Sequence, residues 1–175
     1  MTAEYRIPKR AVKAQVMIGG EPPRELQFFV GPRAAHHDAG ERPSDVLNGS
    51  EAFVPVRDAK GQTWLLNLDA VLVVTVAAHE ENMSRTLEFQ TSSAACLDVV
   101  MGLEGSLRVR GSVRYVLPEG QQRLQNYLRQ AQRFVALHDG PWVHLVNRHR
   151  VIWVQCPATD AKAARGEPLG TAARP

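Results

Sequence analysis

The sequence predicts a mainly β fold (α+β) built from two copies of a small unit, and three observations lead to this prediction. Short stretches with alternating apolar residues recur along the 175-residue chain, and many are rich in β-branched residues. Only two helices are predicted, and both are short: one from its Pro and capping residues, the other from an apolar face. Residues 42–58 align without a gap with residues 123–139. The matches fall at apolar, turn and cap positions, which specify a fold, so we infer an internal duplication.

The duplication sets the predicted domain boundaries. Phe53 meets Phe134 and, after one turn residue is deleted, Asn67 meets Asn147. The predicted parts are an N-terminal tail (1–10), repeat unit one (11–91), repeat unit two (92–156) and a disordered C-terminal tail (157–175), which has little to bury. Because the units are small and the joint between them is partly apolar, we expect β-barrels or half-barrels packed as an intimate pseudo-dimer.

Each predicted unit begins with two strands and a short helix. The strands cover 11–18 and 25–30 in unit one, and 97–103 and 106–117 in unit two. In unit one Arg42 and Asp45 lie at the start of the helix and Asn48 at its end, where polar side chains satisfy free backbone groups. The helix of unit two covers 121–132 and includes Arg123, the counterpart of Arg42.

Each unit then continues with a strand, a turn and a long strand. The long strands cover 63–76 and 142–155. Asn67 and Asn147 lie inside them and predict a bulge or a kink, because Asn tolerates the left-handed region of backbone space. Such a bend would help a small barrel to close. Residues 85–91 predict an additional edge strand that only unit one has.

The sequence contains no pattern typical of a membrane span or a secreted protein. No apolar run approaches the roughly 18 to 20 residues that a spanning helix needs, and charges and Pro8 occupy the place of a signal-peptide core. We therefore expect a cytoplasmic protein without membrane contact. Cys96 and Cys156 form no C-x-x-C motif, and we expect each to be buried as a small apolar residue.

The motifs of common catalytic sites are absent from the sequence. It contains no G-x-S-x-G nucleophile and no glycine-rich phosphate loop. We therefore expect neither an enzyme nor a cofactor. The segment His36-His37-Asp38 leaves metal binding open, although a solvated polar loop is the expectation there, since a structural zinc site needs four ligands.

The charges of the chain are unevenly distributed between the predicted units. Residues 30–90 contain nine acidic and five basic residues, whereas residues 103–154 contain eight arginines and three acids. Unit two therefore has a basic surface that the small total charge of +3 conceals. The candidate partner contacts are Arg108, Arg110 and Arg114, which share one face of a predicted strand, and the pair Arg148 and Arg150, with the aromatic residues Tyr115, Trp142 and Trp153 nearby.

One pattern carries a resemblance to a known family. It reads R-x-S-D-x-L-N, then F-V-x-V, then L-x-N-x-x-x-V, and it consists of Arg42, Ser44, Asp45, Leu47, Asn48, Phe53, Val54, Val56, Leu65, Asn67 and Val71. It resembles a family of small bacterial domains of unknown function, and it is present twice. Unit two departs from it, with Gln125, Asn126 and Arg129 in place of Ser44, Asp45 and Asn48. The layout also loosely resembles Sm-type small β-barrels. Neither resemblance implies an activity.

Two functional hypotheses follow. The first is a non-catalytic protein-interaction, scaffold or assembly component of the bacterial cytoplasm, which binds a protein partner or itself. The alternative is a nucleic-acid-binding module that uses the basic face of unit two, since arginines beside aromatic rings suit single-stranded nucleic acid. The sequence leaves the partner, the pathway and the oligomeric state open.

Overall fold

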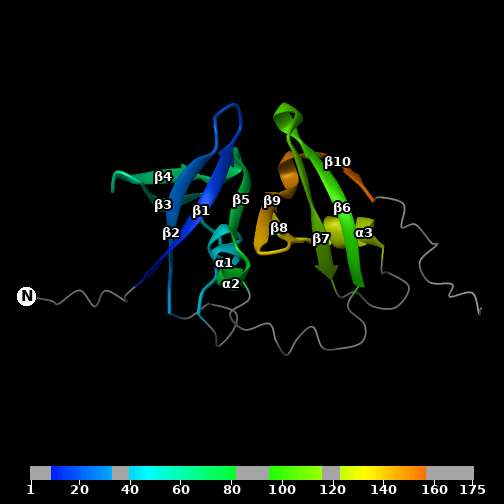
Figure 1. Cartoon of the computed structure of the whole chain (residues 1–175), viewed down its shortest axis with the longest axis horizontal. Helices are drawn as coiled ribbons and strands as arrows, with labels where there is room; N and C mark the ends of the chain where they lie inside the picture. The colour runs from blue at the N-terminus through cyan, green and yellow to red at the C-terminus, as the bar shows by residue number, and fades with distance from the viewer. Residues whose placement is uncertain (1–8, 33–39, 82–94, 116–122, 157–175) are drawn as a thin grey trace, which may run out of the picture.

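A computed structural model describes residues 9–32, 40–81, 95–115 and 123–156 of the chain. Ten antiparallel strands form one sheet in the order β10-β6-β7-β8-β9-β5-β1-β2-β3-β4 (Figure 1). The strands are β1 (Arg10–Ile18), β2 (Arg24–Val30), β3 (Phe53–Asp58), β4 (Thr63–Asn67), β5 (Val71–Ala77), β6 (Ala95–Leu103), β7 (Arg108–Tyr115), β8 (Phe134–Asp139), β9 (Trp142–Asn147) and β10 (Val151–Gln155). The mainly β class is thus confirmed.

Within the described residues the helices are few and short. They are α1 (Pro43–Leu47), α2 (Ala78–Glu81) and α3 (Leu124–Gln130), with the 3-10 turns η1 (Leu68–Ala70), η3 (Glu104–Ser106) and η4 (Arg148–Arg150). The two predicted helices, α1 and α3, are therefore present, whereas α2 was not predicted. No helix in the described ranges is long and apolar enough to cross a membrane. The predicted strand 85–91, the segment 36–38 and the C-terminal tail lie outside the described residues.

The strand order forces each half of the sheet to curl. The order is β5-β1-β2-β3-β4 in the first half and β10-β6-β7-β8-β9 in the second. A flat run of five strands would separate β4 and β5 by about 19 Å. Only the turn η1 joins them, and the four residue steps from Asn67 to Val71 span at most about 14 Å. Each half therefore bends round, and the two halves stand side by side in Figure 1 with β5 and β9 between them.

Asn67 and Asn147 bend the chain in a different way from the one predicted. Each lies at the N-terminus of a 3-10 turn with φ of −73° and −68°, so neither adopts the left-handed conformation. The Asn67 Oδ1 accepts a hydrogen bond from the Asp69 backbone N at 3.0 Å, and the Asn147 Oδ1 accepts one from the His149 N at 3.1 Å. The predicted bend is present, but a capped turn produces it.

The core consists of two clusters of buried apolar side chains. The first is built mainly on β1 to β5 and the second mainly on β6 to β9. Each also takes side chains from the other half: Val143 and Leu145 of β9 join the first, and Leu72 and Val73 of β5 join the second. The β9·β5 joint is thus part of the core. We name the paired strands β9 and β5 the internal joint.

The prediction that both cysteines are buried is wrong. Cys96 and Cys156 are exposed. Cys96 lies on β6 opposite Arg114 of β7, on the face that points away from the buried side chains Val99 and Met101. Cys156 follows directly after β10, which is an edge strand. Composition alone does not distinguish an outward strand position from an inward one.

Candidate interaction surfaces

The edge strands β4 and β10 carry the most exposed large apolar side chains of the described residues. Leu65 on β4 is 72% exposed and Ile152 on β10 is 67% exposed. Trp64 on β4, Trp153 on β10 and Phe53 on the neighbouring β3 are also exposed. Within the described part of the chain, β4 pairs only with β3 and β10 only with β6. Such edges present unpaired backbone groups to which another strand can add.

The Trp153 side chain on the edge strand β10 contacts residues of the two neighbouring strands, β6 and β7. Gly102 of β6 lies opposite Arg108 of β7 on one side and Trp153 of β10 on the other. A Cβ atom at Gly102 would lie 2.1 Å from the Trp153 ring. The indole therefore covers the glycine, and the Arg108 guanidinium lies 5.6 Å from the ring centroid in a cation–π contact.

The predicted arginine face of β7 has the expected geometry. Arg108, Arg110 and Arg114 are exposed, whereas Val109 and Val113 between them are buried. Three positive charges therefore share one surface. Of the predicted aromatic neighbours, Trp153 contacts Arg108, but Tyr115 is buried and stacks on Tyr127 with ring centroids 4.9 Å apart.

The second predicted pair, Arg148 and Arg150, is not on one face of a strand. Both residues belong to the turn η4, so the alternation that would align them does not apply. The Arg148 Nη1 donates to the Leu128 and Arg129 carbonyls at the end of α3, at 3.1 and 3.3 Å. Arg150 donates to the Asp69 carbonyl from Nε at 2.8 Å. Both guanidinium groups thus brace neighbouring elements.

Helix α1 is held by its own polar side chains and by the second half. The Asp45 carboxylate accepts hydrogen bonds from the Arg42 backbone N at 2.9 Å and from the Arg42 guanidinium at 3.1 Å. The Asn48 Nδ2 donates to the Phe134 carbonyl at 3.1 Å, and its Oδ1 accepts from the Phe134 N at 2.8 Å. Asn48 thus joins the end of α1 to β8. Arg123 is the N-cap residue of α3 but forms no side-chain cap there.

Within the described residues, Asn147 donates hydrogen bonds that its counterpart Asn67 does not. Its Nδ2 donates to the Leu68 carbonyl at 3.3 Å and to the Val71 carbonyl at 3.0 Å, across the internal joint. Asn147 is 1% exposed. Asn67 is half-buried, and its Nδ2 has no hydrogen-bond partner among the described residues.

A polar cavity of about 280 Å³ lies between the helices of the two halves. Its lining includes Arg42, Glu81, Arg114 and His138. Glu81 is only 6% exposed and accepts a hydrogen bond from the Ser44 backbone N at 2.8 Å. Burial raises the pKa of the Glu81 carboxyl above its ordinary value of 4.5, although hydrogen bonds from Ser44 and the charge of Arg42 act in the opposite direction.

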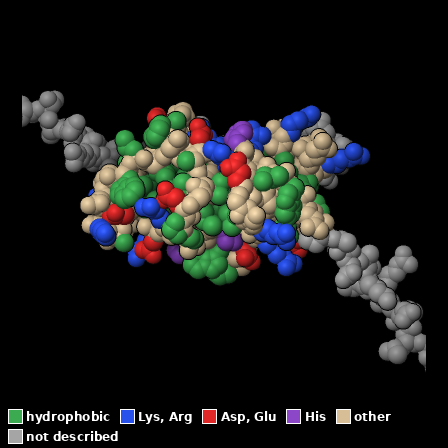
Figure 2. Space-filling view, turned by 90° about the horizontal axis from the view of Figure 1, so that it is seen from above, with side chains coloured by type: hydrophobic (Ala, Val, Ile, Leu, Met, Phe, Trp, Pro, Cys, Tyr) green, Lys and Arg blue, Asp and Glu red, His purple; other side chains and the backbone are tan. Residues whose placement is uncertain are grey.

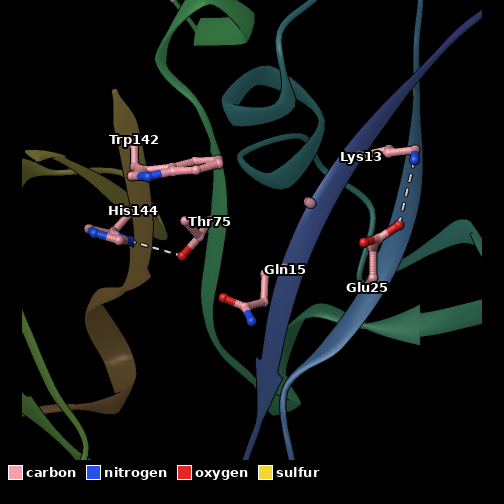
Figure 3. A pocket seen from close by; sticks show the side chains of 7 residues that line it. Lys13, Gln15, Glu25, Thr75, Trp142 and His144 are labelled. Atoms are coloured by element: carbon pink, nitrogen blue, oxygen red, sulfur yellow. Dashed lines mark hydrogen bonds and ion pairs between the residues drawn. The ribbon is translucent and has the colours of Figure 1, made fainter. Parts of the chain in front are cut away.

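A shallow groove of about 600 Å³ crosses the internal joint on the outer face of the sheet (Figure 3). The His144 Nδ1 and the Thr75 Oγ1 are 2.9 Å apart and form a hydrogen bond across β9 and β5. Trp142 borders the groove on one side, and an ion pair between Lys13 and Glu25 borders it on the other. Each of these two pairs joins side chains of neighbouring strands.

The face seen in Figure 2 has most of its acidic side chains on the left half, whereas basic side chains dominate the right end. This matches the uneven charge of the sequence. Among the described residues, no group of three or more His, Cys, Asp or Glu side chains is arranged to hold a metal ion. The segment His36-His37-Asp38 is not part of those residues, so its prediction stays untested.

Sequence reasoning found the arginine face and the helix ends but missed the apolar edges. Trp64, Leu65 and Leu66 are consecutive, and such a run is typical of a strand buried on both faces. In the structure only Leu66 is buried. The sequence signal for an exposed apolar edge was an apolar residue on the outward side of β4. This signal can be interpreted only when the strand is known to lie at the edge of the sheet.

Comparison with known proteins identifies no relative of this chain. No protein-family model matches it, and neither a curated protein nor a solved structure shows significant similarity. The bacterial family and the Sm-type barrel therefore remain resemblances.

Proposed function

We propose that this chain is a non-catalytic interaction module of the bacterial cytoplasm, which binds a protein by strand addition at the open edges of its sheet. The observation that carries the proposal is the exposed apolar surface along β4 and β10, where Leu65 and Ile152 are 72% and 67% exposed. A strand that pairs there gains main-chain hydrogen bonds and buries these side chains. The proposal needs no catalytic group.

We further propose that the chain is a tandem duplication packed as a pseudo-dimer. Two register features support this. Phe53 pairs with Asn67 as Phe134 pairs with Asn147. A bulge skips Leu72 where β5 pairs with β1, and a bulge skips Ile152 where β10 pairs with β6. Leu72 and Ile152 occupy equivalent positions in the sequence alignment of the units.

The test of the interaction proposal compares the tagged chain with an edge variant that carries Leu65→Glu and Ile152→Glu. Both side chains are mostly exposed, so the variant is expected to fold. We expect the original chain to retain specific proteins from a nuclease-treated native lysate and the variant to lose them. Equal retention by both chains would contradict binding at the edges.

The β7 arginine face supports a second candidate function, the binding of single-stranded nucleic acid. Arg108, Arg110 and Arg114 are exposed together, and Trp153 lies beside Arg108. The test is the fluorescence anisotropy of a labelled single-stranded oligonucleotide over a series of salt concentrations. If the face binds phosphates, changing the three arginines to Ala lowers the slope of log affinity against log salt by about 2, at roughly 0.7 for each contact. The matched control changes Lys13, Arg24 and Arg57 to Ala; an equal effect of both variants would reject this function.

A further inference from the structure

The internal joint defines how one half of the molecule contacts the other. Strand β9 pairs antiparallel with β5, with Val73 opposite Val146 and Val76 opposite Val143. The Asn147 Nδ2 closes one end of this joint on the carbonyls of Leu68 and Val71. The joint thus combines strand pairing, apolar burial and a side-chain bond to the turn η1.

The two edge strands have the positions of the two joint strands. In the strand order of the first half β5 is first and β4 is last, and in that of the second half β10 is first and β9 is last. Strand β4 therefore corresponds to β9, and β10 corresponds to β5. In the internal joint β9 of the second half meets β5 of the first. The first half therefore presents an unpaired β9-like strand, and the second half presents an unpaired β5-like strand, within the described part of the chain. These two edges are complementary to each other.

The repeat alignment transfers the register of the internal joint to the edges. Leu66 is equivalent to Val146, and Trp153 to Val73, so Leu66 would lie opposite Trp153. The same shift places Leu65 opposite Val154, Trp64 opposite Gln155 and Thr63 opposite Cys156. The exposed apolar residues of both edges would then be buried against each other.

Two independent features favour the same arrangement. The Asn67 Nδ2, which has no partner among the described residues, would lie where the Asn147 Nδ2 lies in the internal joint, beside the carbonyls of Arg148 and Val151 from the second chain. In addition, residues 30–90 carry a formal charge of −4 and residues 103–154 a charge of +5. A contact between the first half of one chain and the second half of the next therefore joins opposite charges.

We propose that copies of this chain associate head to tail, with β4 of one copy paired to β10 of the next in the register of the internal joint. The contact is heterologous, so it generates a closed ring or a filament rather than a two-fold dimer. This inference rests on the proposed function, because it uses the same edges and names a second copy of the chain as the partner.

The first test is a disulfide between copies. In a Cys96→Ser background, Thr63→Cys is placed opposite the native Cys156, and opposite residues in an antiparallel pair have Cα atoms about 4.5–5.5 Å apart, within disulfide range. Mild oxidation of the purified chain is expected to give linked dimers and longer species on a non-reducing gel. Adding Cys156→Ser is expected to abolish them. Leu65→Cys, two residues out of register, is expected to crosslink far less.

The second test measures mass in solution. Light scattering after size exclusion is expected to give a mass that is a multiple of 19.4 kDa and decreases on dilution. Leu65→Glu is expected to give the monomer, whereas Trp142→Glu, which removes an exposed indole away from both edges, is expected to leave the mass unchanged. Circular dichroism confirms that both variants fold.

The outcomes separate this inference from the proposed function. A purified chain that is monomeric at all concentrations and forms no linked species overturns the inference. If it still captures proteins through its edges, the proposed function stands without self-association. Equal crosslinking of Thr63→Cys and Leu65→Cys would overturn the proposed register.

Discussion

At the scale of single residues, several polar side chains bond backbone groups across the two halves. Asn48 bonds the backbone of Phe134, Asn147 bonds the turn η1, and Arg150 bonds the Asp69 carbonyl. Asn48 bonds both backbone groups of Phe134 in a partly buried place, and Asn147 is 1% exposed, whereas the bond of Arg150 is exposed. Buried polar groups are costly when they are left without a partner. The sequence alignment indicated that Asn67 and Asn147 are equivalent, but not that only one of them crosses the joint.

Replacing these two asparagines gives a matched comparison. Asn147→Ala is expected to destabilise the chain by about 2–3 kcal/mol, because it removes three hydrogen bonds of a side chain that is 1% exposed: those to the carbonyls of Leu68 and Val71, and the one from the His149 backbone N. Asn67→Ala loses only the cap of η1 and is expected to cost about 1 kcal/mol. Urea unfolding at a concentration where the chain is monomeric measures both. Equal costs would contradict the role given to the Asn147 Nδ2.

Glu81 predicts a dependence of stability on pH. Because its pKa is raised in the folded state, the folded chain binds this proton more tightly than the unfolded chain does. The resulting stability is present at low pH and is lost as the pH rises above 4.5 and through the raised pKa. Glu81→Gln does not titrate, so it is expected to gain stability relative to the original chain as the pH rises through this window.

Urea unfolding of both chains between about pH 4 and pH 8 measures this difference. Glu25→Gln, at an exposed carboxylate, is the control for the loss of one negative charge. A difference between Glu81→Gln and the original chain that does not change with pH would contradict the assigned effect of burial.

At the scale of elements, alternation predicted most strands, capping residues predicted α1, and an apolar helical face predicted α3. Two of the failures have a common cause, which is that a strand pattern does not show where a strand stops. The predicted strands 63–76 and 142–155 are each divided by a 3-10 turn, and this turn also moved Arg148 and Arg150 off a strand face. The exposure of β4 and β10 depends on the order of strands, which is a property of tertiary pairing.

The contact between β6 and β10 gives a prediction at this scale. Gly102→Ala is expected to displace the Trp153 indole, because the new methyl group would overlap the ring, and to destabilise the chain by about 1–3 kcal/mol. Tryptophan fluorescence is expected to shift to longer wavelength as the indole becomes more exposed. Gly19→Ala is the control, since nothing lies within 4 Å of its Cβ position. An unchanged spectrum for Gly102→Ala would contradict the packing of Trp153 on this glycine.

At the scale of the whole molecule, the two halves share their cores. Val143 and Leu145 pack in the first cluster, and Leu72 and Val73 pack in the second. Neither half can leave the other without exposing apolar side chains of both. The sequence indicated two units and a partly apolar joint, but the exchange of core side chains depends on the pairing of β9 with β5.

The shared core predicts that the chain unfolds in one cooperative transition. Circular dichroism and tryptophan fluorescence are expected to give the same midpoint in urea, because Trp64 belongs to the first half and Trp142 and Trp153 belong to the second. Residues 1–91 and 92–175, expressed separately, are expected to lack a cooperative transition as monomers. Two separate transitions in the full chain would show that the halves are independent.

The turns η1 and η4 also determine where the chain tolerates a change of length. One residue added to η1 would reverse the alternation of β5 relative to β4. Val73 would then face the first core cluster and Val74 the second, the opposite of their present positions. The hairpin turn between Asp58 and Gln62 is exposed and has a glycine at φ +80°, so an inserted peptide there leaves the register of β3 and β4 in place. Fluorescent labels and affinity tags can therefore be inserted at this hairpin. The length of η1, in contrast, determines how strongly the first half of the sheet curls.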